Sequence, residues 1–209
     1  MIVTISREYG AAGLAVADGV AGALGYDLLT DDIPQTVAAR LGTSEAVVNA
    51  RAFQPRSLSE RILDGLGAGT PESVSPAATR LPGDFDEEMR REIERTIRER
   101  AAGGNIVILG RNAGSVLAGR RDLVRVFLTG ARAWRIARLV EAFAQTTAQA
   151  EADIDRVDVA RRAFARARYK IAWGDARFYD LMLEVSCFGV SAAIELIASA
   201  VRAAESARA

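Results

Sequence analysis

The chain has 209 residues and a mass of 22.3 kDa; half of its residues are hydrophobic and 26% are charged, a composition that excludes overall disorder. The 27 basic residues balance the 27 acidic ones, so the net charge predicts neither a nucleic-acid nor an anionic-membrane partner. The sequence has no histidine, which excludes histidine metal sites and Ser-His or Cys-His catalysis.

Cellular location is predicted from the single cysteine and from the N-terminus. Cys187 alone excludes an internal disulfide and suits a reducing compartment. The N-terminal segment lacks the features of a secretion signal, and the apolar runs are shorter than a membrane span requires. These features together predict a cytoplasmic protein.

Short apolar runs alternate with helical sequence along the chain. The first strand is predicted over residues 1–6, and a glycine-containing turn and an alanine-rich helix ending at Gly25 follow it. Further strands are predicted over residues 105–109, 124–128 and 180–185, and a last helix over 190–204. Strands that alternate with helices predict an α/β fold whose parallel sheet is covered on both faces.

Two stretches between these core elements have a different character. Residues 30–66 show helical spacing, residues 67–84 are rich in proline and glycine and predict a loop, and a charged helix over 86–100 returns the chain to the core. Residues 147–170 predict one or two charged surface helices. Each stretch could be an independent regulatory segment, although helical insertions at the ligand edge of a parallel sheet more often cover a substrate.

The segment SREYGAAG, residues 6–13, joins the first strand to its helix. A glycine turn before a helix N-terminus presents unpaired N–H groups and the positive end of the helix dipole, which together favour an anion. The segment is not a Walker A loop, because Glu8 stands at the first glycine position, Leu14 replaces the lysine and Ala15 replaces the hydroxyl. Phosphate binding and a plain strand-to-helix turn both remain open, with Arg7 as the candidate cation.

Arg111 and Asn112 directly follow the strand predicted over residues 105–109. An arginine at the carboxyl end of a parallel strand lies where such sheets bind ligands, and its guanidinium suits bidentate phosphate contact. The alternative is an arginine that caps a neighbouring helix. Asn112 either contacts the ligand or stabilises the turn.

A third basic segment contains Arg161, Arg162, Arg166 and Arg168, with no carboxylate between residues 159 and 172. Such a run commonly faces solvent. Because two other segments also favour anion binding, however, it predicts that these arginines bind the charged phosphates of a ligand, as phosphoryl transfer requires. Asp175 follows the run, and it is expected to orient one of these arginines or to contact a base or sugar.

Four blocks of the sequence resemble, in the same order, the cytidylate kinase-like proteins, which are divergent relatives of bacterial CMP kinases. The blocks are TISREYGAAG with a helix and LGY after it, VILGRNAGSVL, VRVFLTGARAWRIARL, and YKIAWGDARFYDLMLEVSCFGVSAAIELI. Together they cover nearly the whole chain and leave residues 30–84 poorly matched.

The resemblance implies a three-layer α/β/α core of the P-loop NTPase type with a parallel sheet, formed by one domain over residues 1–209. Its parts would be the core (residues 1–29, 85–146 and 171–209), a helical monophosphate-binding insertion (about 30–84) and a helical lid (about 147–170). The implied reaction is ATP-dependent phosphorylation of a nucleoside monophosphate, CMP or dCMP, with Mg²⁺ accompanying the ATP. An oligomer is compatible with the sequence.

The resemblance also assigns roles to individual residues. The phosphate loop would comprise Ser6, Arg7, Glu8, Tyr9, Gly10, Ala11, Ala12 and Gly13. The catalytic cations would be Arg7, Arg111, Arg161 and Arg168. The substrate would be bound by Arg111, Asn112, Arg166 and Asp175, and no side chain is assigned to a metal.

Two departures from the family pattern bear on activity. The loop reads GAAG followed by Leu14, where the related kinases carry a polar residue, and Asn112 replaces the aspartate of their GRD motif. These departures favour an alternative function, a catalytically impaired pseudokinase that binds nucleotide and regulates a partner. A kinase for another small phosphate acceptor is a third hypothesis, because residues 30–84 would form the acceptor pocket.

Overall fold

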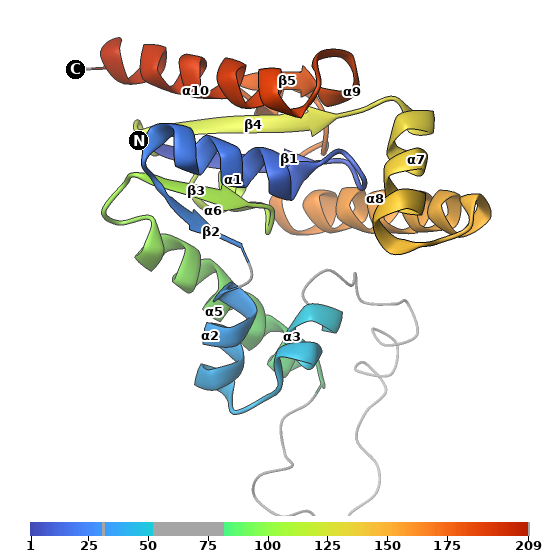
Figure 1. Cartoon of the computed structure of the whole chain (residues 1–209). Coiled ribbons are helices and arrows are strands. Elements are labelled where there is room, and N and C mark those ends of the chain that lie inside the picture. The colour runs from blue at the N-terminus through green and yellow to red at the C-terminus, as the bar shows by residue number, and fades with distance from the viewer. Residues whose placement is uncertain (31, 52–81, 209) are drawn as a thin grey trace, which may run out of the picture.

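The computed structural model describes residues 1–30, 32–51 and 82–208, and the described chain is built around one parallel sheet (Figure 1). The sheet has five strands in the order β2-β3-β1-β4-β5. The strands are β1 (Ile2–Arg7), β2 (Asp27–Leu29), β3 (Ile106–Leu109), β4 (Leu123–Thr129) and β5 (Leu181–Glu184). Every pairing is parallel, so the carboxyl ends of all five strands lie at one edge of the sheet.

Helices cover both faces of this sheet and extend beyond its carboxyl edge (Figure 1). The helices are α1 (Gly13–Leu24), α2 (Asp32–Leu41), α3 (Glu45–Arg51), α5 (Pro82–Arg100), α6 (Ala113–Val116), α7 (Arg132–Phe143), α8 (Thr147–Tyr169), η1 (Ala176–Phe178), α9 (Val185–Phe188) and α10 (Val190–Ser206). Helices α1 and α10 pack on one face, and α2, α5 and α6 pack on the other. The predicted three-layer α/β/α architecture is therefore confirmed.

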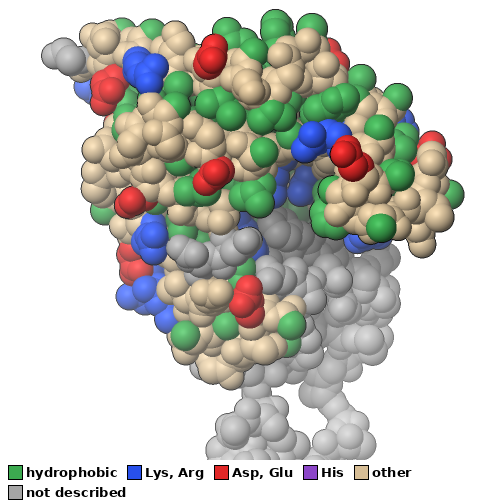
Figure 2. All heavy atoms as spheres, viewed as in Figure 1, with side chains coloured by type: hydrophobic (Ala, Val, Ile, Leu, Met, Phe, Trp, Pro, Cys, Tyr) green, Lys and Arg blue, Asp and Glu red, His purple; other side chains and the backbone are tan. Residues whose placement is uncertain are grey.

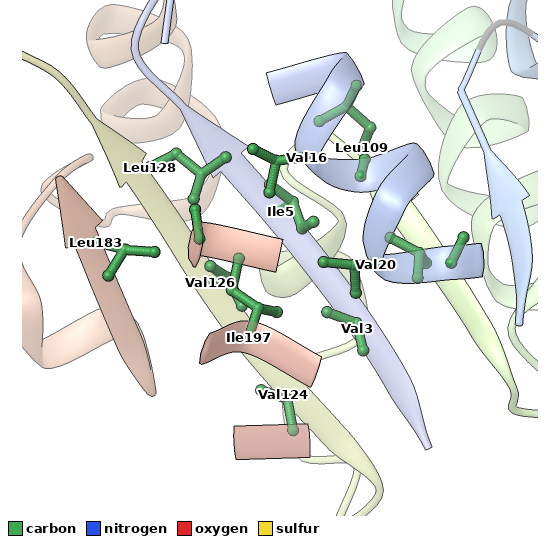
Figure 3. Close-up of a cluster of buried hydrophobic side chains, with 14 of the residues drawn as sticks. Val3, Ile5, Val16, Val20, Leu109, Val124, Val126, Leu128, Leu183 and Ile197 are labelled. Carbon is green, nitrogen blue, oxygen red and sulfur yellow. The ribbon is translucent and has the colours of Figure 1, made fainter. Parts of the chain in front are cut away.

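Alternation along each strand produces two separate hydrophobic cores, since successive side chains point to opposite faces. Val3 and Ile5 of β1 face α1 and α10, where Val126 and Ile197 complete the cluster (Figure 3). Ile2 of β1 faces α5 instead, together with alternate residues of β3. Both faces of the central strands are buried, which explains why β3 and most of β4 are apolar and why the polar residues of β1 come at Thr4 and at its carboxyl end.

The structure corrects the predicted elements in two places. The edge strand β2 was not predicted, because its three residues form too short a run to show a period. Helix α5 begins at Pro82, whereas residues 82–84 were assigned to the preceding loop. Proline is tolerated in the first turn of a helix, because an N–H group there has no hydrogen-bond acceptor within the helix. The rest of that loop and the helical spacing predicted over residues 58–66 lie outside the described residues.

The segment predicted as one or two surface helices is a single helix, α8, whose N-terminus carries a capping box. Thr146 accepts a hydrogen bond from the Gln149 amide, and the Gln149 side chain accepts one from the Thr146 amide. Helices α7 and α8 pack against each other beyond the carboxyl ends of β1 and β4 (Figure 1). None of the described helices combines the length and apolar character needed to cross a bilayer.

Candidate functional site

The turn between β1 and α1 has the backbone shape of an anion-binding loop. Gly10 has a φ of +83° and Ala12 a φ of +56°, so the chain reverses sharply before α1 begins at Gly13. The amides of residues 13–15 form the first turn of this helix and have no carbonyl four residues earlier to bond. These amides and the helix dipole therefore provide a site of positive potential at the carboxyl edge of the sheet.

Arg7 lies between this loop and the turn that follows β3. A Cβ atom placed on Gly13 would lie 2.7 Å from Cγ of Arg7, and one placed on Gly110 would lie 2.2 Å from its Nη1. The side chain of Arg7 therefore runs across the first turn of α1 and ends against the backbone of Gly110. Both glycines are needed for this path, because any larger residue would occupy the same space.

A cleft with a volume of about 670 Å³ opens over the turn between β1 and α1, residues 6–13, which we call the loop. It is lined by Arg7, Glu8, Tyr9, Gly10, Ala12, Gly13, Leu14, Ala15, Asp18, Arg138, Leu139, Ala142, Phe143 and Arg161. Figure 2 shows basic side chains in the hollow between the core and the α7–α8 end of the molecule. The loop, three arginines and the exposed side chains of Leu14 and Phe143 thus share one concave surface, which we call the loop cleft.

A largely buried network of two acids and two arginines contacts the backbone of the loop. The Tyr9 amide donates to Oδ1 of Asp158 on α8 at 2.9 Å, and Nη1 of Arg135 on α7 donates to Oδ2 of the same carboxylate at 2.9 Å. Arg135 also donates to the carbonyls of Tyr9 and Gly130. Glu8 lies 3.5 Å from Arg135 and accepts hydrogen bonds from the end of β4.

The second arginine of this network is Arg161, which also belongs to α8. Its Nη1 donates to the carbonyl of Arg7 at 2.9 Å and lies 3.8 Å from Asp158, and its guanidinium stands 5.8 Å from the ring of Tyr9. Burial lowers the pKa of Arg161, and the Asp158 carboxylate acts in the opposite direction. The group stays charged, because arginine ionises far above neutral pH. The structure thus places Arg161 beside the loop.

The turn after β3 is strained at the two residues that the sequence singled out. Gly110, Arg111 and Asn112 have φ values of +80°, +54° and +49°, and the left-handed region is costly for the two that are not glycine. Strain of this kind persists where the surrounding structure imposes it and is concentrated at binding sites. Asn112 is the N-cap residue of α6, and its side chain lines a second cavity.

This second cavity, the polar cavity, has a volume of about 250 Å³ and lies on the opposite face of β1 from α1. It is lined by Thr4, Ser6, Asn112, Gly114, Ser115, Ala118, Arg125, Tyr169, Ile171, Phe178 and Tyr179. Arg125 is held by Asp180 through two side-chain hydrogen bonds, and the ring of Tyr179 packs against Phe127. Burial raises the pKa of Tyr179, so its hydroxyl remains a hydrogen-bond donor at neutral pH. Hydroxyls, an amide and aromatic rings around one small volume suit an uncharged polar ring system.

Three residues predicted as site residues lie elsewhere in the structure. Arg168 forms ion pairs with Glu87 and Glu94 of α5, at 3.2 Å each. Arg166 lies at an exposed position of α8. Asp175 binds the side chain of Arg177, an interaction that lowers the Asp175 pKa to about 2 and leaves its carboxylate at the start of η1. None of the three lines either cavity, and Arg111, in the turn after β3, does not line one either.

Sequence reasoning missed Asp158 and the structural role of Arg135. A signal for Asp158 was present, because it shares one stripe of α8 with Ala150 and Ile154, and all three side chains are buried. A lone carboxylate on an apolar stripe is a candidate for a buried ion pair. Arg135 carries no comparable signal, since a helix with several arginines does not reveal which one turns inward.

The described residues do not form a metal site of their own. No group of three acidic or cysteine side chains in the described part of the chain could hold a cation, and Ala15 offers no hydroxyl where P-loop kinases place one. The residues around the loop therefore do not fit a protein-held Mg²⁺.

Solved structures with the same architecture include kinases. An uncharacterized protein from Eubacterium ventriosum has a TM-score of 0.67 at 18% identity, with 97% of this chain and 98% of that chain covered. A shikimate kinase from Bacteroides thetaiotaomicron has a TM-score of 0.53 at 12% identity over the same shares of the two chains. At these identities the likeness establishes the fold alone, an α/β fold whose parallel sheet has the strand order 2-3-1-4-5 in this chain.

Comparison of the sequence with protein families agrees with this fold. None of the curated proteins matches the chain. The cytidylate kinase-like family matches residues 2–187, which include the phosphate loop, the turn after β3 and helices α7 and α8. The chain belongs to the cytidylate kinase-like family.

Proposed function

We propose that the protein transfers the γ-phosphoryl group of ATP to a nucleoside monophosphate, with CMP or dCMP as the acceptor that the family resemblance suggests. The observation that carries this proposal is the path of Arg7, which connects the loop cleft to the strained turn bordering the polar cavity. A cation in that position lies in the proposed donor site and reaches the turn beside the proposed acceptor site, which is where a group that stabilises a transferring phosphoryl is needed.

The loop cleft is the proposed donor site. The first-turn amides of α1 would bind the β-phosphate, and Arg7 and Arg161 would supply the positive charge that a Walker lysine supplies elsewhere. ATP is taken as its Mg²⁺ complex, because the chain provides no acidic cluster for a resident ion in the described residues. Phosphoryl transfer demands positioned charge rather than covalent participation, which is why arginines suffice for this role.

The polar cavity is the proposed site of the acceptor nucleoside, with its monophosphate directed to Arg111. Asn112 would contact the sugar or base, and Tyr179 and Ser6 would complete the polar lining. Residues 30–84 and 147–170 would be the acceptor-binding insertion and the lid. Arg168 would join the site only by leaving Glu87 and Glu94, so we assign the clamping role to Arg7, Arg111 and Arg161. The reaction and the lone cysteine both suit the cytoplasm.

Thermal unfolding and turnover test this proposal directly. The purified protein should unfold at a higher temperature with Mg²⁺–ATP and with one monophosphate from a panel of all common nucleoside monophosphates. A ligand at 100 times its dissociation constant stabilises the fold by about 2.7 kcal/mol. The same pair should yield ADP and the nucleoside diphosphate in a coupled assay. Absence of transfer to every monophosphate of the panel would contradict the kinase function.

The alternative is a pseudokinase that binds nucleotide without turnover, and Leu14 is the observation that favours it. Leu14 occupies the Walker lysine position, and its side chain is 57% exposed within the loop cleft. An apolar side chain there contributes no charge to a transferring phosphoryl. In this case ATP would raise the unfolding temperature while no monophosphate was phosphorylated.

Substitution of Leu14 by lysine tests whether the donor phosphates lie beside residue 14. We expect Leu14→Lys to bind Mg²⁺–ATP about three- to tenfold more tightly, because the added charge lies in the cleft that already binds phosphate in this proposal. Titration calorimetry measures the change. Leu196→Lys is the matched control, since Leu196 is similarly exposed on α10 and lies outside both cavities. Equal affinity of wild type and Leu14→Lys would place the phosphates away from residue 14.

A further inference from the structure

The middle of α8 is attached to the phosphate loop by a carboxylate that the sequence did not single out. Asp158 is buried, and its two oxygens serve two different donors: Oδ1 accepts from the Tyr9 amide and Oδ2 from Nη1 of Arg135, each at 2.9 Å. The side chains of Arg135 and Asp158 are 8% and 3% exposed. A carboxylate this deeply buried requires both partners, because an unpaired buried charge is strongly unfavourable.

The same network keeps negative charge from accumulating beside an anion site. Glu8 and Asp158 contribute two carboxylates, and Arg135 and Arg161 lie within 3.8 Å of one or both of them. Glu8 and Asp158 are therefore neutralised locally, so the two carboxylates next to the loop backbone add no net repulsion toward a phosphate in the loop cleft. Arg135 also closes the network on the loop backbone through the carbonyl of Tyr9.

We propose that Asp158 is a positioning residue of the donor site: by holding the Tyr9 amide and Arg135, it sets the loop conformation that presents the first-turn amides of α1 to the donor phosphates. This inference rests on the proposed function, because it takes the loop cleft as the donor site. It also implies that the middle of α8 does not move. Any closure of the proposed lid is confined to its ends, while the segment around Asp158 stays docked on the loop.

The test compares Asp158→Asn with Asp155→Asn on the same helix. The two donors meet different oxygens of Asp158, and in asparagine one of these positions becomes an NH2 group that cannot accept, so one of the two hydrogen bonds must be lost. Asp155 is the matched control, because it also pairs with an arginine of α7, Arg132 at 2.7 Å, but it is exposed and does not contact the loop. The probes are Mg²⁺–ATP and CMP as ligands and hydrogen exchange of the Tyr9 amide without ligand.

Asp158→Asn is expected to raise the dissociation constant and KM of Mg²⁺–ATP about tenfold and to change those of the acceptor less than twofold. The Tyr9 amide is expected to exchange at least tenfold faster, and Asp155→Asn to match wild type in every measurement. A merely structural role would weaken both substrates equally. Should Asp158→Asn fold poorly, the paired replacement Arg135→Met with Asp158→Leu removes both charges and retains an apolar contact.

The outcomes separate this inference from the proposed function. Wild-type protein that binds no Mg²⁺–ATP would overturn the donor-site assignment and, with it, the positioning role. Wild-type protein that binds Mg²⁺–ATP, with a folded variant that binds it equally well, would overturn the positioning role alone. An unchanged exchange rate of the Tyr9 amide in Asp158→Asn would overturn it whatever the nucleotide binding.

Discussion

Replacement of Arg7 by alanine is expected to lower kcat for phosphoryl transfer by about 10²–10³, with a much smaller effect on the KM of the acceptor. The physical reason is that Arg7 spans the loop cleft and the turn after β3, where it would meet charge that develops in the transition state. Steady-state kinetics with Mg²⁺–ATP and the acceptor identified from the panel measure the effect. An interaction made mainly in the transition state appears in kcat rather than in KM.

Two further variants define the role of Arg7. Arg121→Ala is the control, because Arg121 is an exposed arginine before β4 that lines neither cavity, and its removal should leave the kinetics unchanged. Arg7→Lys should recover only part of the activity, since a lysine does not reproduce the planar guanidinium. Arg7→Ala protein with wild-type kcat would exclude Arg7 from the reaction.

Substitution of Gly110 by alanine is expected to lower kcat by about 10- to 100-fold by moving Arg7 rather than removing it. A Cβ at residue 110 would lie 2.2 Å from Nη1 of Arg7, and the flexible end of that side chain gives way more easily than the backbone. A displacement of about 1 Å at a catalytic group can cost about 10² in rate. Kinetics and thermal unfolding of the variant measure the two effects separately.

Gly119→Ala is the matched control for backbone strain. Gly119 has a φ of +88°, close to the +80° of Gly110, but a Cβ there would meet no atom within 4 Å. Both variants should lose a similar stability, about 1–2 kcal/mol for a left-handed alanine. Only Gly110→Ala should lose activity. If the two variants lose activity equally, the loss would come from strain and the displacement of Arg7 would be irrelevant.

Much of the fold was predictable because it depends on local pattern. The runs at residues 105–109 and 124–128 are apolar except for Asn105 and Arg125, a pattern typical of strands buried on both faces, and β3 and β4 lie there in the structure. The turn between β1 and α1 was predictable for a similar reason, since its glycines and the helix that follows are close together in sequence. The edge strand β2 was not predictable, because three residues paired with only one neighbour carry too little pattern.

The sequence by itself determined the parallel α/β sheet, the position of the loop at its carboxyl edge and the supply of arginines. It could not determine which arginines turn toward the loop, because a charged side chain on a helix follows the partners that tertiary packing places within its reach. Arg161 meets the carbonyl of Arg7, whereas Arg168, seven residues later on α8, meets Glu94 of α5. Tertiary structure alone brought Asp158 to the Tyr9 amide, since 149 residues separate the two groups in sequence and only the docking of α8 makes them neighbours.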